Sequence, residues 1–334
     1  MRFQILFLLL SIRSLTACQQ APQQEAVAST DSSLAPVISC TQDDKTMPII
    51  YQSTDGGLTW KDISTGLPRE KPVESFTVDK GQVLMSFPAG LYQGSVAANA
   101  PRWERDFLLH DRIVSFSKGQ SGAYALTGDN RFLHNIAKNS WVQVCSELSA
   151  QHLRSIFETQ SGILLVGCDN GMFKSIDQGK TWKQVFHDGI ILNMVESNGV
   201  IIAGGQQGIL RSTDGGENWS WVLSEGGVGI ATELIKGGFA SITYNTTTKT
   251  RRVRTSYDGG KTWNAIDAGL PGDDQIASIK QVENYFICGH PKGIYRSADQ
   301  GKTWQLVLKP VGQKVYNIAV SDAVVYAVPM FGGC

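Results

Sequence analysis

The sequence lacks an excess of charge of either sign, because 30 Lys and Arg residues balance 30 Asp and Glu residues over 334 positions. A domain that binds a polyanion usually carries a clear positive excess, so the composition gives no support to nucleic-acid binding. Charged residues make up 18% of the chain and hydrophobic residues 42%. That balance excludes a largely disordered chain and is sufficient for a globular core.

The sequence also lacks the short motifs of several enzyme classes. It contains no Gly-x-Ser-x-Gly, His-Glu-x-x-His, Cys-x-x-Cys or Gly-x-x-x-x-Gly-Lys segment, which excludes the usual esterase, zinc-protease, dithiol and P-loop arrangements. The five histidines are scattered and have no metal-ligand spacing. We therefore expect neither a metal nor a cofactor.

Long apolar runs are missing at the N-terminus as well. The apolar stretch 3–10 is too short to cross a bilayer, which takes about 20 residues, so residues 1–17 are predicted to be a signal peptide. Leu15-Thr-Ala-Cys18 resembles the bacterial lipobox, which implies cleavage before Cys18 and lipidation of that cysteine. The alternative is an ordinary secretory signal with a chance cysteine. Residues 18–47, rich in Gln, Ala, Ser and Pro, are predicted to form a flexible tether.

The remaining chain, residues 48–334, is dominated by one octapeptide of the form Ser-x-Asp-x-Gly-x-Thr-Trp, with Asn218 replacing Thr in the third of its five copies. Asp followed by a small or amide residue and Gly favours a tight turn between two strands. Because the motif recurs once per unit, we assign its aspartates and tryptophans a structural role: Asp55, Asp177, Asp214, Asp258, Asp299, Trp60, Trp182, Trp219, Trp263 and Trp304.

The spacing of the tryptophans predicts the number of units. With Trp103 and Trp141 as remnants of two worn copies, seven tryptophans recur about every 41 residues. Each interval holds four short apolar runs separated by turn residues, and no stretch shows a sustained helical period. This pattern predicts an all-β fold, a seven-bladed β-propeller of four-stranded blades.

Closure of the ring is predicted from the two ends of the repeat. The segment 48–60 supplies only the third and fourth strands of a blade, and the segment 315–328 supplies only the first and second. Together they complete one blade. Cys40 and Cys334 would then lie on the same side of the ring, where they could form a disulfide or remain two free thiols. Cys145, Cys168 and Cys288 are predicted to be reduced, half-buried side chains.

The octapeptide resembles the Asp-box, or bacterial neuraminidase repeat. One seven-bladed Asp-box ring behind a lipoprotein-like leader is similar to the YCF48-like photosystem II assembly factors and their non-photosynthetic bacterial relatives, and more distantly to sortilin-type propellers. The resemblance implies a non-enzymatic platform that binds a membrane protein or peptide. The photosynthetic members use an arginine-rich face, but the only local arginine cluster here, residues 251–254, lies on a predicted third strand, which argues against a photosystem role.

Sialidases also carry Asp-boxes and supply the alternative function, a carbohydrate-active or carbohydrate-binding propeller. Their Arg-Ile-Pro motif is absent, and the nearest fragment is Asp111-Arg112-Ile113-Val114. If the chain were an enzyme, a glycoside hydrolase would be the expected class.

Polar residues in the connections that enter the innermost strands, and in the turns between second and third strands, are predicted to ring one mouth of the central channel. The candidates for this binding rim are His110, Asp111, Arg112, His152, Arg154, Asp169, His187, Asp188 and Lys292. Such a rim is either a binding surface or simply solvated loop polarity. The sequence thus predicts a lipid-anchored extracytoplasmic scaffold that binds protein or peptide partners through one loop-rich face.

Overall fold

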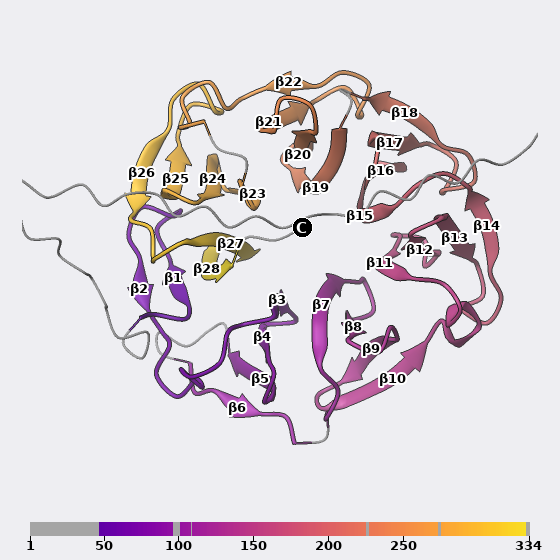
Figure 1. Ribbon diagram of the computed structural model, residues 1–334, viewed down its shortest axis with the longest axis horizontal. Helices are drawn as coiled ribbons and strands as arrows, with labels where there is room; N and C mark the ends of the chain where they lie inside the picture. Colours follow the sequence, from indigo (N-terminus) through magenta and orange to yellow (C-terminus); the bar gives the residue numbers. More distant parts are fainter. Residues whose placement is uncertain (1–46, 96–100, 108, 225–226, 273–274, 332–334) are drawn as a thin grey trace, which may run out of the picture. The chain divides into compact units, whose positions relative to one another are not determined.

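The computed structural model describes residues 47–95, 101–107, 109–224, 227–272 and 275–331. The predicted signal peptide, almost all of the predicted tether, and Cys18, Cys40 and Cys334 lie outside these residues. The described chain forms seven four-stranded antiparallel sheets arranged as blades of a ring (Figure 1). Its helical content is a single 3-10 turn, η2 (Ser146–Leu148). The prediction of a seven-bladed, all-β propeller is confirmed.

Six blades are each made from four consecutive strands, ordered from the centre of the ring outwards. The first three are β3 (Ser75–Asp79), β4 (Gln82–Phe87), β5 (Gly90–Ser95), β6 (Glu104–Arg105); β7 (Ile113–Lys118), β8 (Ala123–Thr127), β9 (Phe132–Ala137), β10 (Ser140–Val144); and β11 (Leu153–Glu158), β12 (Leu164–Cys168), β13 (Gly171–Ser175), β14 (Lys183–Phe186).

The next three blades continue the same pattern around the ring. They are β15 (Ile191–Ser197), β16 (Val200–Gly205), β17 (Gly208–Ser212), β18 (Ser220–Leu223); β19 (Gly227–Ile235), β20 (Gly238–Asn245), β21 (Thr250–Ser256), β22 (Asn264–Ala265); and β23 (Ser278–Val282), β24 (Tyr285–His290), β25 (Gly293–Ser297), β26 (Gln305–Leu308).

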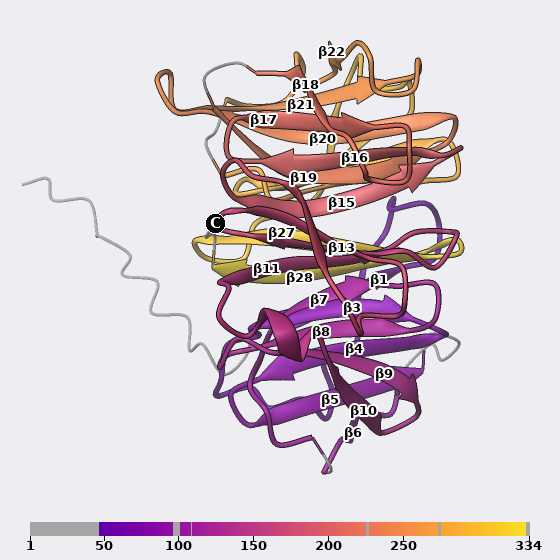
Figure 2. The ribbon, with the colours of Figure 1, turned by 90° about the vertical axis from the view of Figure 1, so that its right-hand side faces the viewer.

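The seventh blade joins both ends of the described chain. β27 (Lys314–Ser321) and β28 (Val324–Phe331) are its inner strands, and β1 (Tyr51–Ser53) and β2 (Lys61–Asp62) are its outer strands. β1 pairs antiparallel with β28, with Gln52 opposite Tyr326, so the yellow and indigo ribbons lie side by side in both views (Figures 1 and 2). The predicted closure of the ring is confirmed.

Apolar layers between neighbouring blades form the core, and each layer contains a tryptophan at a repeated position; the layer of Trp219 also contains Trp221. Seven clusters of buried side chains fill the seven joints, and the tryptophan always comes from the start of the fourth strand of the later blade. These seven are Trp60, Trp103, Trp141, Trp182, Trp219, Trp263 and Trp304. The tryptophan spacing therefore predicts the blade count because each blade needs one such side chain to pack against the preceding blade.

Each Asp-box is a turn between the third and fourth strands, braced by its own aspartate. In the first copy Asp55 accepts hydrogen bonds from the Thr59 N–H at 2.9 Å, the Thr59 hydroxyl at 2.5 Å and the Ser53 hydroxyl at 2.8 Å. Gly57 has φ +80°, and a Cβ there would lie 2.5 Å from Ile287 of the preceding blade, so only glycine fits. In the third copy the Asn218 amide replaces the threonine hydroxyl as donor, 2.8 Å from Asp214.

Cations just before three of the box serines tie each turn to the next blade. Arg211 donates to the Gly259 carbonyl at 2.6 Å, Arg296 donates to the Gly56 carbonyl at 2.8 Å, and Lys174 donates to Glu217 at 3.2 Å. Each acceptor belongs to the Asp-box of the following blade, so the boxes form a linked series along one face of the ring.

Three cysteines are more deeply buried than the sequence analysis predicted. Cys145, Cys168 and Cys288 are reduced, as expected, but they are fully buried in the joints. Burial raises the pKa of the Cys168 thiol to about 12, which keeps it protonated and unreactive in the folded state.

We expect the Asp-boxes to make stability fall in acid. Burial is the largest single influence and raises the pKa of Asp55, but the hydrogen bonds from Thr59, Ser53 and Leu58 together outweigh it and lower the pKa to about 2. The stabilisation is complete above the pKa of an unfolded aspartate, about 3.9, and is lost as the pH falls towards 2. In urea titrations from pH 7 to pH 2, Asp55→Asn should lower the free energy of unfolding by roughly 1 kcal/mol at pH 7 and flatten its decline in acid. Glu104→Gln, an exposed control on β6, should keep the wild-type profile; identical profiles for both variants would contradict this role.

A disulfide between Cys40 and Cys334, one of the two alternatives for these thiols, can be tested directly. Met47 and Phe331, at the two ends of the described chain, line the same small pocket. Cys40 lies seven positions before Met47, and Cys334 lies three positions after Phe331. These segments are long enough for the two thiols to meet. We expect mass spectrometry of non-reduced peptides to find the two cysteines linked, and Cys334→Ala to lower the melting temperature as far as a reductant does. Two alkylatable thiols in the native protein would refute the pairing.

Candidate binding face

Antiparallel strands give the ring two distinct faces. The Asp-box turns lie on one face, together with the turns between first and second strands. The opposite face carries the connections into β3, β7, β11, β15, β19, β23 and β27 and the turns between second and third strands, and we refer to it as the loop face. All nine predicted rim residues fall in segments of the loop face.

Two arginines of the predicted rim are held on the loop face by carboxylates. Arg154, in β11, makes a two-pronged ion pair with Asp169, and its Nη2 lies 3.0 Å from Oδ2. Arg112 donates through Nε to Glu74 at 2.7 Å, and its side chain is 64% exposed. Arg112 directly precedes β7. Both guanidinium groups are therefore oriented but accessible.

A second ion-pair cluster occupies the turn between β8 and β9. Arg131 donates to Asp129 at 2.8 Å and to Asp111 at 2.5 Å. Asn130 crosses to the next blade, where its amide donates to the Gln151 carbonyl at 2.7 Å and accepts the Leu153 N–H at 2.9 Å. This turn is thus braced both within its blade and across the joint.

The other predicted rim residues are more dispersed. His110, His152, His187 and Lys292 are exposed, and Asp188 accepts a hydrogen bond from Gln207 at 2.8 Å. His290, the last residue of β24, is fully buried, with its Nδ1 accepting the Lys292 N–H and its Nε2 lying 3.0 Å from the Pro271 carbonyl.

The central channel contains a cavity of about 740 Å³ lined by the innermost strands. Its polar features include the Glu233–Lys280 ion pair between β19 and β23. None of the nine predicted rim residues lines this cavity.

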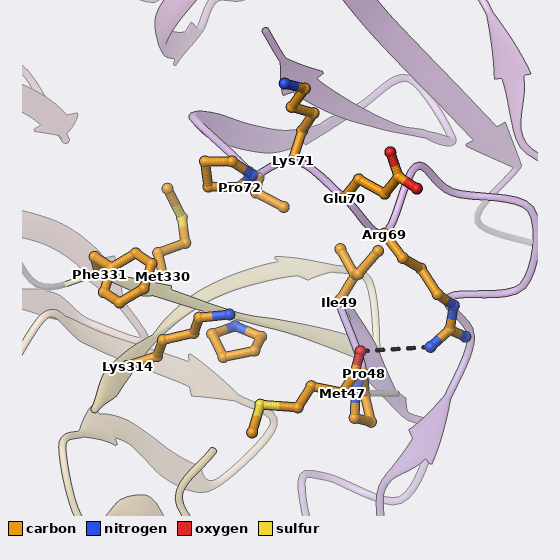
Figure 3. A pocket seen from close by; sticks show the side chains of 12 residues that line it. Met47, Pro48, Ile49, Arg69, Glu70, Lys71, Pro72, Lys314, Met330 and Phe331 are labelled. Atoms are coloured by element: carbon orange, nitrogen blue, oxygen red, sulfur yellow. Dashed lines mark hydrogen bonds between the residues drawn. The ribbon is translucent and has the colours of Figure 1, made fainter. Parts of the chain in front are cut away.

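A smaller pocket of about 150 Å³ opens on the loop face where the ring closes (Figure 3). Met47, Met330 and Phe331 contribute apolar surface, and Figure 3 shows the Arg69 guanidinium directed at the Met47 carbonyl, 3.5 Å away. Lys71 and Lys314 give the margin a positive excess over its single acid, Glu70. Sequence analysis missed this pocket because four separate segments build it, and only the closed ring brings them together.

The pocket and the arginines are linked by residues that are neighbours in sequence or in ion pairs on the loop face. Val73 lines the pocket, and the next residue, Glu74, holds Arg112. The path continues through the Asp111–Arg131 pair to Arg154 and Asp169 on the following blade. The loop face thus presents a pocket of mixed polarity and, on the blades that follow, two ion-paired guanidinium groups.

The Asp-box face holds one cluster with nucleophilic character. The Ser121 hydroxyl donates to Glu158 at 2.6 Å and lies 3.1 Å from His134 Nε2, and the His134 ring stacks on Tyr124. The carboxylate contacts the serine rather than the far side of the imidazole. A serine triad needs the opposite arrangement, with the acid orienting the base, so this cluster serves as a link between blades.

Within the described ranges, no three His, Cys, Asp or Glu side chains gather in a way that could hold a metal ion. The same part of the chain has no helix long and apolar enough to span a membrane.

Comparison with known proteins supports the repeat and the fold. Residues 295–306 match the family model of the BNR/Asp-box repeat. The chain carries Asp-box repeats. No curated protein matches the sequence significantly.

Several solved structures share the architecture at low identity. YCF48 from Cyanidioschyzon merolae aligns with a TM-score of 0.57 and 14% identity, over 81% of this chain and 98% of that one. YCF48 bound to D1 peptide aligns with a TM-score of 0.52 and 14% identity, over 77% and 93% of the two chains. The extracellular domain of a putative one-component system from B. thetaiotaomicron aligns with a TM-score of 0.59 and 13% identity, over 78% of this chain and 38% of that one. At these identities the likeness shows the propeller fold.

The Arg154–Asp169 pair can be tested through the carboxylate. The hydrogen bond from Arg154 is the main reason that the pKa of Asp169 lies below its ordinary value. In carboxyl-detected NMR titrations, Arg154→Ala should raise the pKa of Asp169 towards about 3.9, whereas Lys292→Ala should leave it unchanged. An Asp169 pKa that is insensitive to Arg154 would show that the pair does not form in solution.

Proposed function

We propose that this protein is an extracytoplasmic, membrane-anchored scaffold that binds a protein or peptide partner through its loop face without catalysing a reaction on it. The observation that carries the proposal is the series of loop-face groups that runs from the pocket lined by Met47 and Phe331, here called the closure pocket, through Arg112 to Arg154. The comparison with YCF48, which has been solved bound to D1 peptide, adds support at the level of the fold.

The geometry of this surface suits a polypeptide partner. Arg112 and Arg154 are held by carboxylates yet remain 64% and 46% exposed, so little side-chain entropy is lost when they bind a partner. A guanidinium forms paired hydrogen bonds with carboxylates and backbone carbonyls. The pocket beside them is large enough for one apolar side chain, and its positive margin favours an acidic neighbour.

The proposed location rests on the leader and on one structural neighbour. The predicted signal peptide and Cys18 supply a route to a lipid anchor outside the cytoplasm. An extracellular domain of a bacterial sensor shares the fold. Anchoring would keep the propeller close to membrane proteins, which we propose as its partners.

Affinity capture from crosslinked membranes, read by mass spectrometry, tests the proposal. The double variant Arg112→Ala, Arg154→Ala should reduce recovery of the specific partner by about tenfold or more, because it removes two exposed charged donors from the surface. Met330→Arg should have a similar effect because it fills the pocket.

The control removes the same charge from the opposite face. Lys261 and Lys302 are exposed residues of two Asp-boxes, and the variant Lys261→Ala, Lys302→Ala should capture the partner like the wild type. Circular dichroism and melting curves must show that all three variants fold. Equal recovery by the loop-face variants and the control would refute the role of this face.

A further inference from the structure

The joint between the β3–β6 blade and the β7–β10 blade is built differently from its neighbours. The β7–β10 blade, like the β3–β6 blade, has no Asp-box, and only two residues connect β9 to β10. An open cleft of about 390 Å³ lies beside this short turn, lined in part by Trp141 and Gln143 of β10 and by Leu109 and Leu133. Its volume falls within the range of small-molecule sites, roughly 300–1,000 Å³.

Trp141 differs from the other joint tryptophans in its hydrogen bonding. Four of them donate the indole N–H to a glycine carbonyl in their own box, and Trp103 and Trp304 donate to Ile63 and Ile266 of the preceding blade. Among the described residues, Trp141 has a ring contact with Phe116 and no hydrogen-bond acceptor for its N–H. A partly buried indole normally finds an acceptor, so a ligand in the cleft could supply one.

The polar groups around Trp141 combine donors and acceptors without a net charge. Asp111 and Arg131 form an ion pair, and Arg131 also pairs with Asp129, so neither charged group that lines the cleft is unpaired. Asn139 accepts from Gln93 through its carbonyl oxygen at 2.8 Å, which leaves its amide N–H groups available for a ligand. Gln143 is exposed, and its amide has no partner among the described residues. A phosphate would lack an unpaired cation here, and an amine would lack an unpaired carboxylate.

We infer that this cleft binds a neutral sugar, with Trp141 as the platform. An indole presents an apolar face for the C–H groups of a pyranose ring and an N–H donor for a ring substituent. Planar amide and carboxylate groups such as those of Gln143, Asn139 and Asp111 match pairs of vicinal hydroxyls, which both donate and accept. The site shares Asp111 and Arg131 with the proposed peptide surface, but Trp141, Asn139 and Gln143 belong to the cleft alone, and the inference does not depend on that proposal.

Isothermal titration of the full-length protein in detergent tests the inference. The probes are cellohexaose, maltohexaose, mannohexaose and chitohexaose, each supplied to millimolar concentration. We expect the wild type to bind at least one of them. Trp141→Ala should abolish that binding, Trp141→Phe should weaken it about five- to tenfold by removing the N–H, and Gln143→Ala should weaken it about three- to tenfold.

Val142→Ala is the matched control, because Val142 is an exposed neighbour on the same strand and points to the opposite side of the sheet. It should bind the probe like the wild type. Gln143→Ala removes an exposed side chain, so its effect does not depend on the folding of the tryptophan variants. The inference would be overturned if none of the four probes bound, or if binding were unchanged in the Trp141 and Gln143 variants. It would also be overturned if a peptide, and no sugar, bound in a way that depends on Trp141.

Discussion

The packing of one tryptophan into each joint between blades is the interaction on which the rest of the structure depends. A single four-stranded blade exposes both of its faces and cannot bury its apolar side chains alone. Each blade therefore gains its core only from its neighbours. The indole at the start of the fourth strand widens the apolar layer at the outer rim, where neighbouring blades diverge and small side chains would leave a gap.

The two faces of the ring divide structural and surface roles. On the Asp-box face, aspartates brace each turn internally, and Lys174, Arg211 and Arg296 connect it to the following turn. The loop face has no repeated element of this kind, and its polar contacts differ from blade to blade. The polar contacts of the loop face can differ from blade to blade because the Asp-box turns and the apolar joints already hold the strands in place.

The sequence predicts the fold well because the information is periodic and local. The octapeptide specifies a turn by itself, and its period specifies the ring and the blade in which the ends meet. Contacts between distant segments were not predictable in the same way. The cations before the box serines look like ordinary strand residues until the next turn is placed beside them. A second signal was readable but not used: Trp-x-x-Ile-x-x-Gly-Leu-Pro occurs at 60–68 and 263–271, and in both places the isoleucine carbonyl accepts the indole N–H of the next blade.

The candidate binding site was predictable only in part, because it also depends on contacts between segments that are distant in the sequence. Strand order alone places Arg112 and Arg154 on the loop face. It does not show that His290 turns inward, because that depends on the Lys292 N–H and the Pro271 carbonyl. The closure pocket needs both chain ends in place. The free indole of Trp141 becomes visible only when the hydrogen bonds of the other six tryptophans are known.

The pairing of β1 with β28 also constrains the order in which the molecule can mature. Until the final strands have been synthesised, β1 and β2 have no inner half to join, and the apolar layers on both sides of that blade lack Tyr326 or Val325. A chain that stops early is consequently not a smaller propeller but an open arc with an unpaired sheet edge. Such an unpaired edge is exposed to proteases and prone to aggregation. Chains that lack the last two strands should therefore be degraded or aggregate, whereas full-length chains close the ring.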